Sequence, residues 1–376
     1  MNAPAGSRLS DRQRLAWLRL IRTPNVGPAS FRDLINRFGS AETALEMLPE
    51  LALSGGASRI LRVPSRAEAE AEMETAAKAG ARFVAVGEPD YPPLLRRMEH
   101  PPPLLAVKGD GAVFRLPPVA IVGARNASLA GIRMAQTLAA ELGAAGYGVV
   151  SGLARGIDTA AHRGSLATGT VGVLAGGLDQ PYPPENAGLC EDIAENGGAI
   201  ISEMPFGWQP RAQDFPRRNR IVAGMATGLV VVEAAKRSGS LISARLAGEM
   251  GRLVFAVPGS PLDPRAGGTN GLLKDGAILV TETADILTAL APLSALPPAP
   301  PAPLEEPPSF PVAPPPGEDD RARVVEMLGP VPVAVDDVIS HTGLHPAQVF
   351  MILLELDLAG RLERHAGGNV SLLSGE

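Results

Sequence analysis

The sequence predicts an α/β protein: a doubly wound parallel sheet, preceded by a helical domain and followed by a winged helix. Three observations predict this class. Residues 80–292 alternate short apolar runs with helical stretches, which is typical of a parallel sheet covered by helices on both faces. Residues 8–75 have helical periodicity, and residues 319–374 read as a helix–turn–helix followed by a hairpin. A proline-rich linker over residues 293–318 separates the sheet from the winged helix.

Composition and charge limit the classes of protein to consider. A chain of 376 residues is too long for one ordinary core, which predicts two or three domains. Its single cysteine, Cys190, excludes a disulfide framework and a cysteine-based zinc site. No apolar run is long enough to span a bilayer and the N-terminus has no apolar signal core, so we expect a cytoplasmic protein without membrane contact. The net charge of −6 argues only weakly against nucleic acid, because the basic residues are clustered.

The N-terminal segment, residues 8–75, is expected to be a small helical domain of the helix-hairpin-helix (SAM-like) type. Its helical pattern surrounds a glycine-containing turn, Thr23-Pro-Asn-Val-Gly-Pro28, where backbone amides can meet a phosphate. Residues 8–37 hold seven arginines against two acidic residues, a local charge of +5. A domain that only packs, with its basic face in solvent, fits the pattern equally well.

Six near-continuous apolar runs within residues 80–292 are the expected strands. They are Val119–Val122, Gly148–Ser151, Val171–Leu174, Ala199–Ser202, Leu229–Glu233 and Leu253–Val257. Continuous apolar runs fit strands that are buried on both faces, and Leu129–Ala145 shows the apolar stripe of a helix between two of them. Ligands of such sheets bind at the carboxyl ends of the strands, so the residues that follow each strand form the candidate site.

Three of these strand ends have the composition of an anion site. The loops are Gly123-Ala-Arg-Asn-Ala-Ser128, Ser151-Gly-Leu-Ala-Arg-Gly-Ile-Asp158 and Glu233-Ala-Ala-Lys-Arg-Ser-Gly-Ser240. Each brings a glycine, a hydroxyl side chain and a cation to the start of the next helix, where unsatisfied amides carry partial positive charge. Three such loops in one sheet predict a ligand that carries phosphate.

Motifs of common enzymes are absent from the chain. There is no G-x-G-x-x-G after the first strand, no G-x-x-x-x-G-K-[ST] and no G-x-S-x-G, so we expect no dinucleotide cofactor, no P-loop and no nucleophile elbow. Asp158 and His162 lie four residues apart on one helix, but the sequence supplies no further ligands near them. We interpret both side chains as braces of the loop, and we assign no catalytic residue, metal ligand or cofactor.

A basic segment with aromatic residues follows the fourth strand. It runs from Phe206 to Arg220 and places Phe206, Trp208 and Phe215 beside four arginines. Residues 211–252 carry eight basic and three acidic residues. Rings that stack and cations that pair with phosphates suit single-stranded nucleic acid. In the alternative interpretation the rings belong to the core and the arginines pair with acidic residues.

The C-terminal segment is expected to be a tethered module. Residues 297–316 contain eleven prolines in twenty positions, and an extended polyproline tether of that length can hold two domains up to roughly 60 Å apart. Beyond it, residues 319–374 have the layout of a winged helix. The second helix of this module, PAQVFMILLELDLAG, holds no arginine or lysine. We therefore interpret the module as a protein-interaction or degenerate domain, not as a reader of the major groove.

Taken together, the motifs of the middle segment resemble the bacterial DNA processing protein A family, also called DprA or Smf. They include IVGARNAS, SGLARGIDTAAHRG, GGLDQPYPPEN, FPRRNRIVAG, VVVEAAKRSGSLISARLA and GGTNGLLKDGA, in register over about residues 87–290. The resemblance implies an extended Rossmann domain that binds single-stranded DNA, forms a homodimer and interacts with the RecA recombinase. Carried over onto this chain, the DNA-binding residues are Arg125, Gly152, Arg155, Arg218, Asn219, Arg220, Lys236, Ser238 and Ser240, and we add Phe215 from the aromatic segment. This chain has Ala124 where the family usually has serine or threonine.

We therefore expect a protein that protects incoming single-stranded DNA and loads RecA onto it in natural transformation, with no enzymatic activity of its own. Two alternatives remain open. The sequence VPGS followed by GGTN is faintly similar to the loop of nucleoside-monophosphate phosphoribohydrolases, although Leu272, Leu273 and Lys274 stand where that loop needs a catalytic glutamate. The second alternative is a transcriptional regulator that acts through the winged helix.

Overall fold

The computed structural model describes residues 8–59, 61–294, 314–365 and 367–373, which form two compact units. Residues 8–9 and 70–294 make the first unit, which holds the large sheet. The remaining described residues come from both ends of the chain and make the second unit. The linker expected at residues 293–318 lies mostly outside the described residues.

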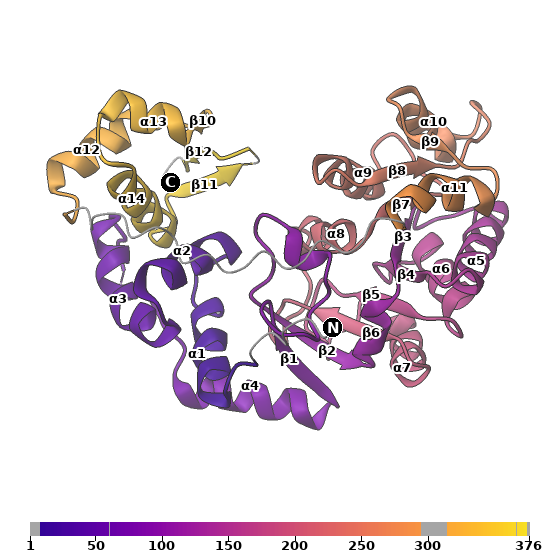
Figure 1. Cartoon of the computed structure of the whole chain (residues 1–376), viewed down its shortest axis with the longest axis horizontal. Coiled ribbons are helices and arrows are strands. Elements are labelled where there is room, and N and C mark those ends of the chain that lie inside the picture. Colours follow the sequence, from indigo (N-terminus) through magenta and orange to yellow (C-terminus); the bar gives the residue numbers. More distant parts are fainter. Residues whose placement is uncertain (1–7, 60, 295–313, 366, 374–376) are drawn as a thin grey trace. The chain divides into compact units, whose positions relative to one another are not determined.

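The first unit is built on a nine-stranded sheet in the order β1-β2-β6-β5-β4-β3-β7-β8-β9 (Figure 1). The strands are β1 (Ala81–Ala85), β2 (Leu104–Gly109), β3 (Pro118–Val122), β4 (Gly148–Ser151), β5 (Thr170–Val173), β6 (Ala199–Ser202), β7 (Gly228–Val231), β8 (Leu253–Ala256) and β9 (Ile278–Leu279). From β6 to β9 neighbouring strands run parallel, whereas β2 is antiparallel to β6 and β1 to β2. The chain proceeds from β3 to β4 on one side and returns to β7 on the other, so the strand order reverses at β3.

The six strands predicted from the sequence are confirmed as β3 to β8, with ends that agree to within two residues. Three further strands lie at the edges of the sheet and were not predicted. β1 alternates buried and exposed residues over only part of its length, and β9 has two residues, so neither carries the continuous apolar run of a central strand. The predicted doubly wound sheet is correct, and these antiparallel and short edge strands extend it.

Helices cover both faces of the sheet, as the apolar strands predict. The helices of this unit are α5 (Leu129–Ala144), α6 (Ile157–Ser165), α7 (Ala187–Glu195), α8 (Asp214–Met225), α9 (Gly239–Glu249), α10 (Gly267–Lys274), α11 (Thr283–Ser294) and most of α4 (Arg66–Lys78), whose first four residues belong to the second unit. In β3, Val119 and Ile121 pack with buried residues of α5, α6 and α11, while Ala120 and Val122 pack on the side of α8 and α9. Successive strand residues point to opposite faces, which is why every position of a central strand is apolar.

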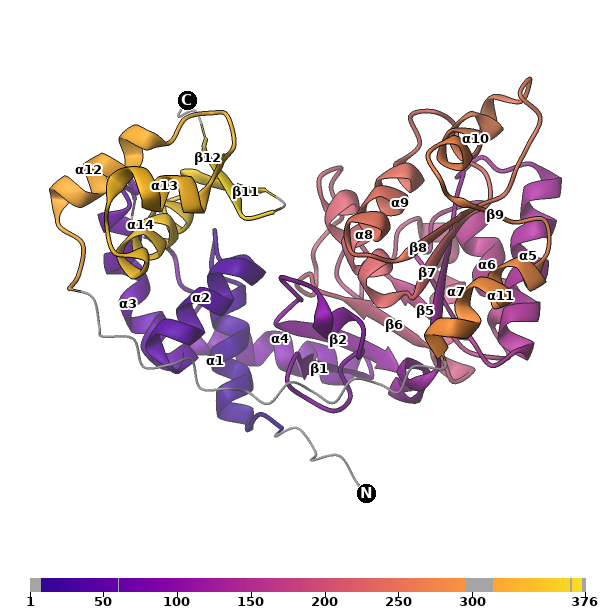
Figure 2. The same ribbon diagram turned by 45° about the horizontal axis from the view of Figure 1, so that its top comes forward.

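The second unit combines an N-terminal set of helices with a winged helix (Figure 2). Its elements are α1 (Asp11–Ile21), α2 (Pro28–Phe38), α3 (Ala41–Ser54), α12 (Glu318–Met327), α13 (Val335–Thr342), α14 (Pro346–Leu358), and a three-stranded sheet of β10 (Val333–Ala334), β12 (Asn369–Leu372) and β11 (Leu362–His365). Ser10 caps α1 with its side chain, and the left-handed Gly39 ends α2. The predicted winged-helix layout is thus confirmed. Among the described residues, no helix combines the length and apolar character needed to cross a membrane.

The two parts of the second unit share one hydrophobic core. Met351, Leu354 and Leu358 of α14 pack with buried residues of α1, α2 and α3, such as Leu34 and Leu48. The expectation that the proline tether separates the winged helix as an isolated module is therefore wrong. The tether allows a large separation, but the apolar surface of α14 makes contact with the N-terminal helices more favourable than exposure to water.

Candidate nucleic-acid interface

A cavity of about 630 Å³ opens at the carboxyl ends of the central strands, where the strand order reverses. Its lining comes from the loop after β3, the loop after β4, the first turns of α8, and the loop between β7 and α9. A smaller cavity of about 290 Å³ adjoins it and shares Arg125, Phe215 and Arg218 with it. The strand ends predicted to form an anion site do meet at one place.

The cavity is strongly cationic. Four arginines line it, Arg125, Arg218, Arg237 and Arg265, against the single carboxylate of Asp158. Arg125 is exposed at the rim, and its guanidinium carbon lies 5.1 Å from the centre of the Phe215 ring. Repulsion from Arg125 contributes to lowering the pKa of Arg218, although desolvation is the larger cause. Arg125 and Arg218 are therefore close enough to repel each other, an arrangement that an anion would relieve.

Arg218 forms the floor of the cavity and is 6% exposed. Its Nη1 donates hydrogen bonds to the carbonyl of Gly152 and to that of Val173 at 3.0 Å, so it joins the ends of β4 and β5. A Cβ added at Gly152 would overlap this guanidinium, which explains why the loop needs glycine there. Burial lowers the pKa of Arg218, and the nearby Asp158 opposes that shift.

Asp158 and His162 have the bracing contacts expected from the sequence. Asp158 accepts hydrogen bonds from the amides of Gly152 and Ala154 at 3.1 and 3.3 Å, which hold the loop after β4. Burial raises the pKa of its carboxyl, while Arg218 and these amides act in the opposite direction. His162 is fully buried, and its Nδ1 lies 2.8 Å from Oγ1 of Thr170. Burial, with the charge of Arg218, lowers the pKa of His162 to about 3, so the ring is neutral at neutral pH.

The loop after β3 is held against its neighbours by close backbone contacts. Gly156 has φ of 74°, and a Cβ there would overlap the carbonyl of Ala124. The amide of Ile157 donates to the same carbonyl at 3.2 Å. Only glycine permits this backbone conformation and approach at low cost. The packing of the two loops fixes the backbone on which Arg125 stands.

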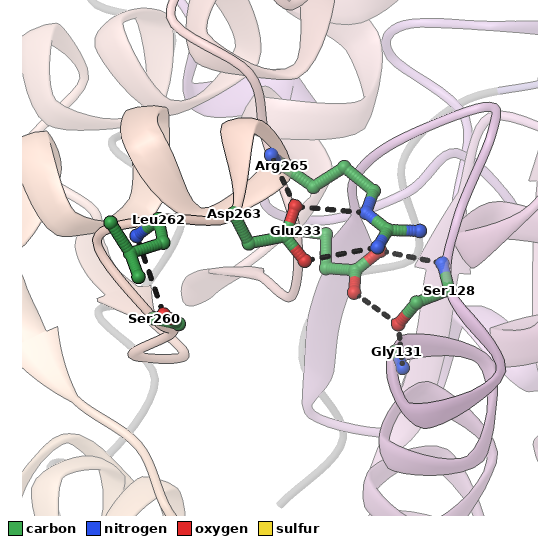
Figure 3. Close-up of polar contacts among 7 residues, drawn as sticks. All are labelled: Ser128, Gly131, Glu233, Ser260, Leu262, Asp263 and Arg265. Atoms are coloured by element: carbon green, nitrogen blue, oxygen red, sulfur yellow. Dashed lines mark hydrogen bonds and ion pairs between the residues drawn. The ribbon is translucent and has the colours of Figure 1, made fainter.

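Two sets of hydrogen bonds lie next to the cavity (Figure 3), and of their residues Arg265 belongs to its lining. Glu233, just beyond β7, accepts hydrogen bonds from the amide of Ser128 at 2.9 Å and from its Oγ at 2.5 Å. Ser128 Oγ in turn accepts from the amide of Gly131 at 2.9 Å, which caps α5. Nε and Nη2 of Arg265 each donate to Asp263 at 3.0 Å, and these hydrogen bonds are the main reason why the pKa of Arg265 is raised. Arg265 is thus held in position before any ligand arrives.

The start of α9 supplies hydroxyl groups to the cavity. Ser238 caps this helix, and its Oγ lies 2.7 Å from Oγ of Ser240. Both serines line the cavity, as does Asn219, whose Nδ2 donates to the carbonyl of Gly239 at 3.4 Å. Because a helix N-terminus carries partial positive charge, these hydroxyls and amides add to the attraction for an anion.

Not all the residues singled out in the sequence reach this cavity. Arg220 forms an ion pair with Glu203 and donates to the carbonyl of His100 at 3.1 Å, away from the lining. Lys236 is exposed and lies against Gly267, and it is absent from the lining, where Arg237 stands in its place. Arg155 lines the smaller cavity and forms an ion pair with Glu185. Adjacent basic residues in a loop point in different directions, which the sequence alone does not reveal.

The sequence reading missed several residues that line the two cavities. Tyr182 lines the smaller one beside Phe215, with ring centres 5.6 Å apart and an angle of 63° between the planes. Arg237 and Arg265 line the larger one. The motif GGLDQPYPPEN contains Tyr182, but only the fold brings it to Phe215. Trp208, in contrast, donates from Nε1 to Asp214 at 2.9 Å and does not line either cavity, in line with a structural role.

Family models match the chain over three stretches. The model of DNA recombination-mediator protein A matches residues 82–291, a DprA-like N-terminal HHH domain matches residues 11–75, and a DprA winged helix domain matches residues 296–368. The first of these contains the whole candidate interface, and the three follow the order of the chain.

Curated relatives and solved structures agree with these matches. The chain is 40% identical to the protein Smf of Escherichia coli over 285 residues, which cover 75% of each chain. It is similar to the X-ray structure of DNA processing protein A from Streptococcus pneumoniae, with a TM-score of 0.63 and 31% identity over 75% of this chain and 98% of that one. A structure of the Helicobacter pylori protein, titled for its single-stranded DNA binding mode, matches with a TM-score of 0.52 and 30% identity over 56% of this chain and 96% of that one. The chain belongs to the DNA recombination-mediator protein A (DprA/Smf) family.

Proposed function

We propose that this protein binds single-stranded DNA in the cationic cavity, protects it, and presents it to the RecA recombinase in DNA recombination and natural transformation. The observation that carries the proposal is the convergence of four arginines, against one carboxylate, on the carboxyl ends of the strands. Phosphates are the ligands that such a site attracts most strongly. The relative from Helicobacter pylori, whose structure is titled for single-stranded DNA binding, supports this ligand.

The site favours a single strand over a duplex. The arginines lie inside a cavity, and the two rings of Tyr182 and Phe215 lie next to them in the smaller cavity. An unpaired base can turn away from its backbone and stack on an aromatic ring, whereas a paired base cannot do so without melting the duplex. Phosphate contacts carry no base information, so we expect little sequence preference.

We assign the DNA contacts to the residues that line the cavities. Seven of these residues were expected from the sequence, namely Arg125, Arg155, Phe215, Arg218, Asn219, Ser238 and Ser240. The structure adds Tyr182, Arg237 and Arg265. Gly152 is assigned an indirect role, because it makes room for the Arg218 guanidinium. Arg220 and Lys236 are assigned no contact, since neither of them lines the larger or the smaller cavity.

The resemblance to the family supports our proposal for the partners. We infer a homodimer that interacts with RecA and acts in the cytoplasm, where both partners meet the incoming strand. We further infer that the protein binds DNA without transforming it. The buried Asp158 and neutral His162 already hydrogen-bond to the loop and to Thr170, so neither is poised to act as an acid or base on a ligand.

A comparison of single-stranded with duplex DNA tests the proposal. Equal lengths of oligo-dT and of a duplex are titrated with the full chain and followed by gel shift. We expect at least tenfold tighter binding of the single strand, and equal or tighter binding of the duplex would refute the proposal. The hydrolase alternative is tested by incubating the protein with AMP and measuring free adenine by chromatography. Release of adenine at ordinary enzymic rates would support the hydrolase and contradict our proposal. Light scattering tests the proposed dimer, and a monomer mass at micromolar concentration would contradict it.

A further inference from the structure

Helix α14 is buried on two sides. Val349, Ile352, Leu353 and Leu356 belong to the core of the winged helix itself. Met351, Leu354 and Leu358, which are at most 7% exposed, belong to the core of the N-terminal helices. A helix that is apolar all round is a buried helix. The composition of PAQVFMILLELDLAG therefore has a structural cause, namely that this helix joins two sets of elements.

Polar contacts fix how α14 and the N-terminal helices α1, α2 and α3 fit together, an interface that we call the joint. Asn25 donates from Nδ2 to the carbonyl of Leu358 at 3.0 Å, and Arg361 donates to the carbonyl of Gly55 at 3.0 Å. Arg364 donates to Asp33 of α2 at 3.0 Å and to Asp357 of α14 at 2.9 Å. The contacts involve the turn before α2, the end of α3 and the strand β11. Hydrogen bonds at three separate points specify one arrangement of the two parts.

The backbones themselves meet at Gly55. A Cβ at this position would overlap the backbone carbonyl of Glu355 in α14. The φ of Gly55 is −75°, which any residue adopts, so it is the approach of α14 that requires glycine and not the local backbone conformation. The side chain of Glu355 is buried as well, and Nε and Nη2 of Arg321 each donate to it at 2.7 Å.

The joint covers the helix of this unit that nucleic-acid recognition would use, and the turn before α2 contacts that helix through Asn25. In helix-turn-helix proteins the second helix enters the major groove, but here that helix is α14. In the turn before α2, the amide of Val26 donates to Thr23 and that of Gly27 to Ser30 Oγ at 2.9 Å, while Pro28 has no amide hydrogen. The phosphate contact expected of this turn would need amides that are engaged within the turn itself.

We propose that the winged helix is a docking module whose partner is the N-terminal helical domain of the same chain. Its second helix is used to hold α2 and α3, not to read DNA. The two chain ends, which precede and follow the cavity unit in the sequence, thus form one body. This inference is independent of the proposed DNA-binding function, because it concerns contacts within the second unit alone.

Cutting the linker in the intact protein tests the proposal. Residues 302–310 are replaced by a protease recognition sequence, the full chain is purified with a C-terminal affinity tag, and the linker is cut. We expect the C-terminal fragment to remain bound to the rest of the chain on size exclusion at micromolar concentration. We expect Gly55→Ala to weaken this association at least tenfold, because its methyl group overlaps the α14 backbone. Gly329→Ala is the matched control, since nothing lies within 4 Å of a Cβ at that position.

Two outcomes would overturn the proposal. One is separation of the cut wild-type fragments at micromolar concentration. The other is equal retention in Gly55→Ala and Gly329→Ala. Both variants lie in the second unit, so a far-ultraviolet circular dichroism spectrum equal to that of the wild type is the check that the helices of this unit are folded in each variant.

A crosslink distinguishes the same chain from a second copy. In the double variant D33C/R364C, whose side chains are adjacent in the wild type, a short bis-maleimide should give a product of monomer mass on a denaturing gel. When the linker is cut after the reaction, the two fragments should stay joined at the mass of the intact chain, which shows that the crosslink has formed. The natural Cys190 is buried, and its raised pKa keeps it unreactive. A product of twice the monomer mass would assign the partner surface to a second copy and refute docking within one chain.

Discussion

Replacement of Arg125 by alanine tests the proposed interface at its most accessible cation. Arg125 is exposed at the rim of the cavity, and among the described residues nothing forms a hydrogen bond or ion pair with its guanidinium. Its main contact is with the ring of Phe215 at 5.1 Å. It also repels Arg218, so its removal relieves a like-charge interaction in the folded protein. We therefore expect a melting temperature within about 2 °C of the wild type, or slightly above it.

The magnitude of the binding defect follows from counterion release. One phosphate contact on a single strand contributes about 0.7 to the slope of log affinity against log salt. Loss of that contact lowers affinity about fivefold at 0.1 M salt and only about twofold at 0.3 M, because the released-ion term shrinks as salt rises. The loss should be the same for all sequences, since a phosphate contact carries no base information.

The assay is fluorescence anisotropy on oligo-dT over a range of salt concentrations, with thermal melts alongside. Arg245→Ala is the matched control: it removes the same charge from the exposed side of α9, where Arg245 is paired with Glu249, and it does not line the cavity. Its slope should equal that of the wild type. If Arg125→Ala keeps the wild-type slope and affinity while remaining folded, Arg125 does not contact phosphate and the proposed cavity is not the DNA site.

Arg218→Ala provides the contrast of a buried cation. It would leave Asp158 without its charge partner and the carbonyl of Val173 without a donor, at a cost of about 3–5 kcal/mol of folding free energy. The melting temperature should fall by about 6 °C or more, alongside weaker binding. A variant that binds less but melts like the wild type would show that Arg218 contacts DNA without supporting the loop.

Three further predictions concern other parts of the molecule. Folding lowers the pKa of His162 to about 3, so the contribution of the neutral ring to stability is complete above pH 6.5 and declines as the pH falls. The wild type should therefore lose about 2 kcal/mol of unfolding free energy between pH 7 and pH 5 through this residue. In denaturant titrations, His162→Gln should lack this part of the loss. Burial raises the pKa of Cys190 to about 12, so a thiol reagent at pH 8 should label the native protein far more slowly than the unfolded one, and equal rates would contradict its burial. Deletion of residues 314–376 should leave single-strand affinity within about threefold, because the proposed phosphate contacts belong to the other unit. It should also increase the binding of a hydrophobic dye as the apolar faces of α2 and α3 become exposed. A hundredfold loss of affinity in the deletion variant would instead make the winged helix a DNA-binding element.

The sequence by itself determined the six central strands of the sheet and the edge at which the candidate site lies, but not the strands β1, β2 and β9. Apolar runs such as Val119–Val122, between helical stretches, predict strands buried on both faces, and the loops that follow parallel strands lie at one edge. The structure, and not the sequence, shows why Gly152 and Gly156 must be glycine, because a Cβ there would meet the Arg218 guanidinium and the carbonyl of Ala124. Apolar periodicity and turn residues are local properties of the chain, so they can be read from the sequence without knowing the fold.

Only the tertiary structure decided which side chains share the cavity and where the winged helix lies. Lys236 and Arg237 are neighbours in the chain, yet only Arg237 lines the cavity, and Tyr182 reaches Phe215 from another loop. Such directions depend on χ angles and on contacts between distant segments, which a linear pattern does not encode. The apolar character of α14 indicated burial, but not the surface against which it is buried, because the hydrophobic effect is proportional to area and has no direction of its own. The hydrogen bonds of Asn25, Arg361 and Arg364, together with the close approach at Gly55, select the N-terminal helices as that surface.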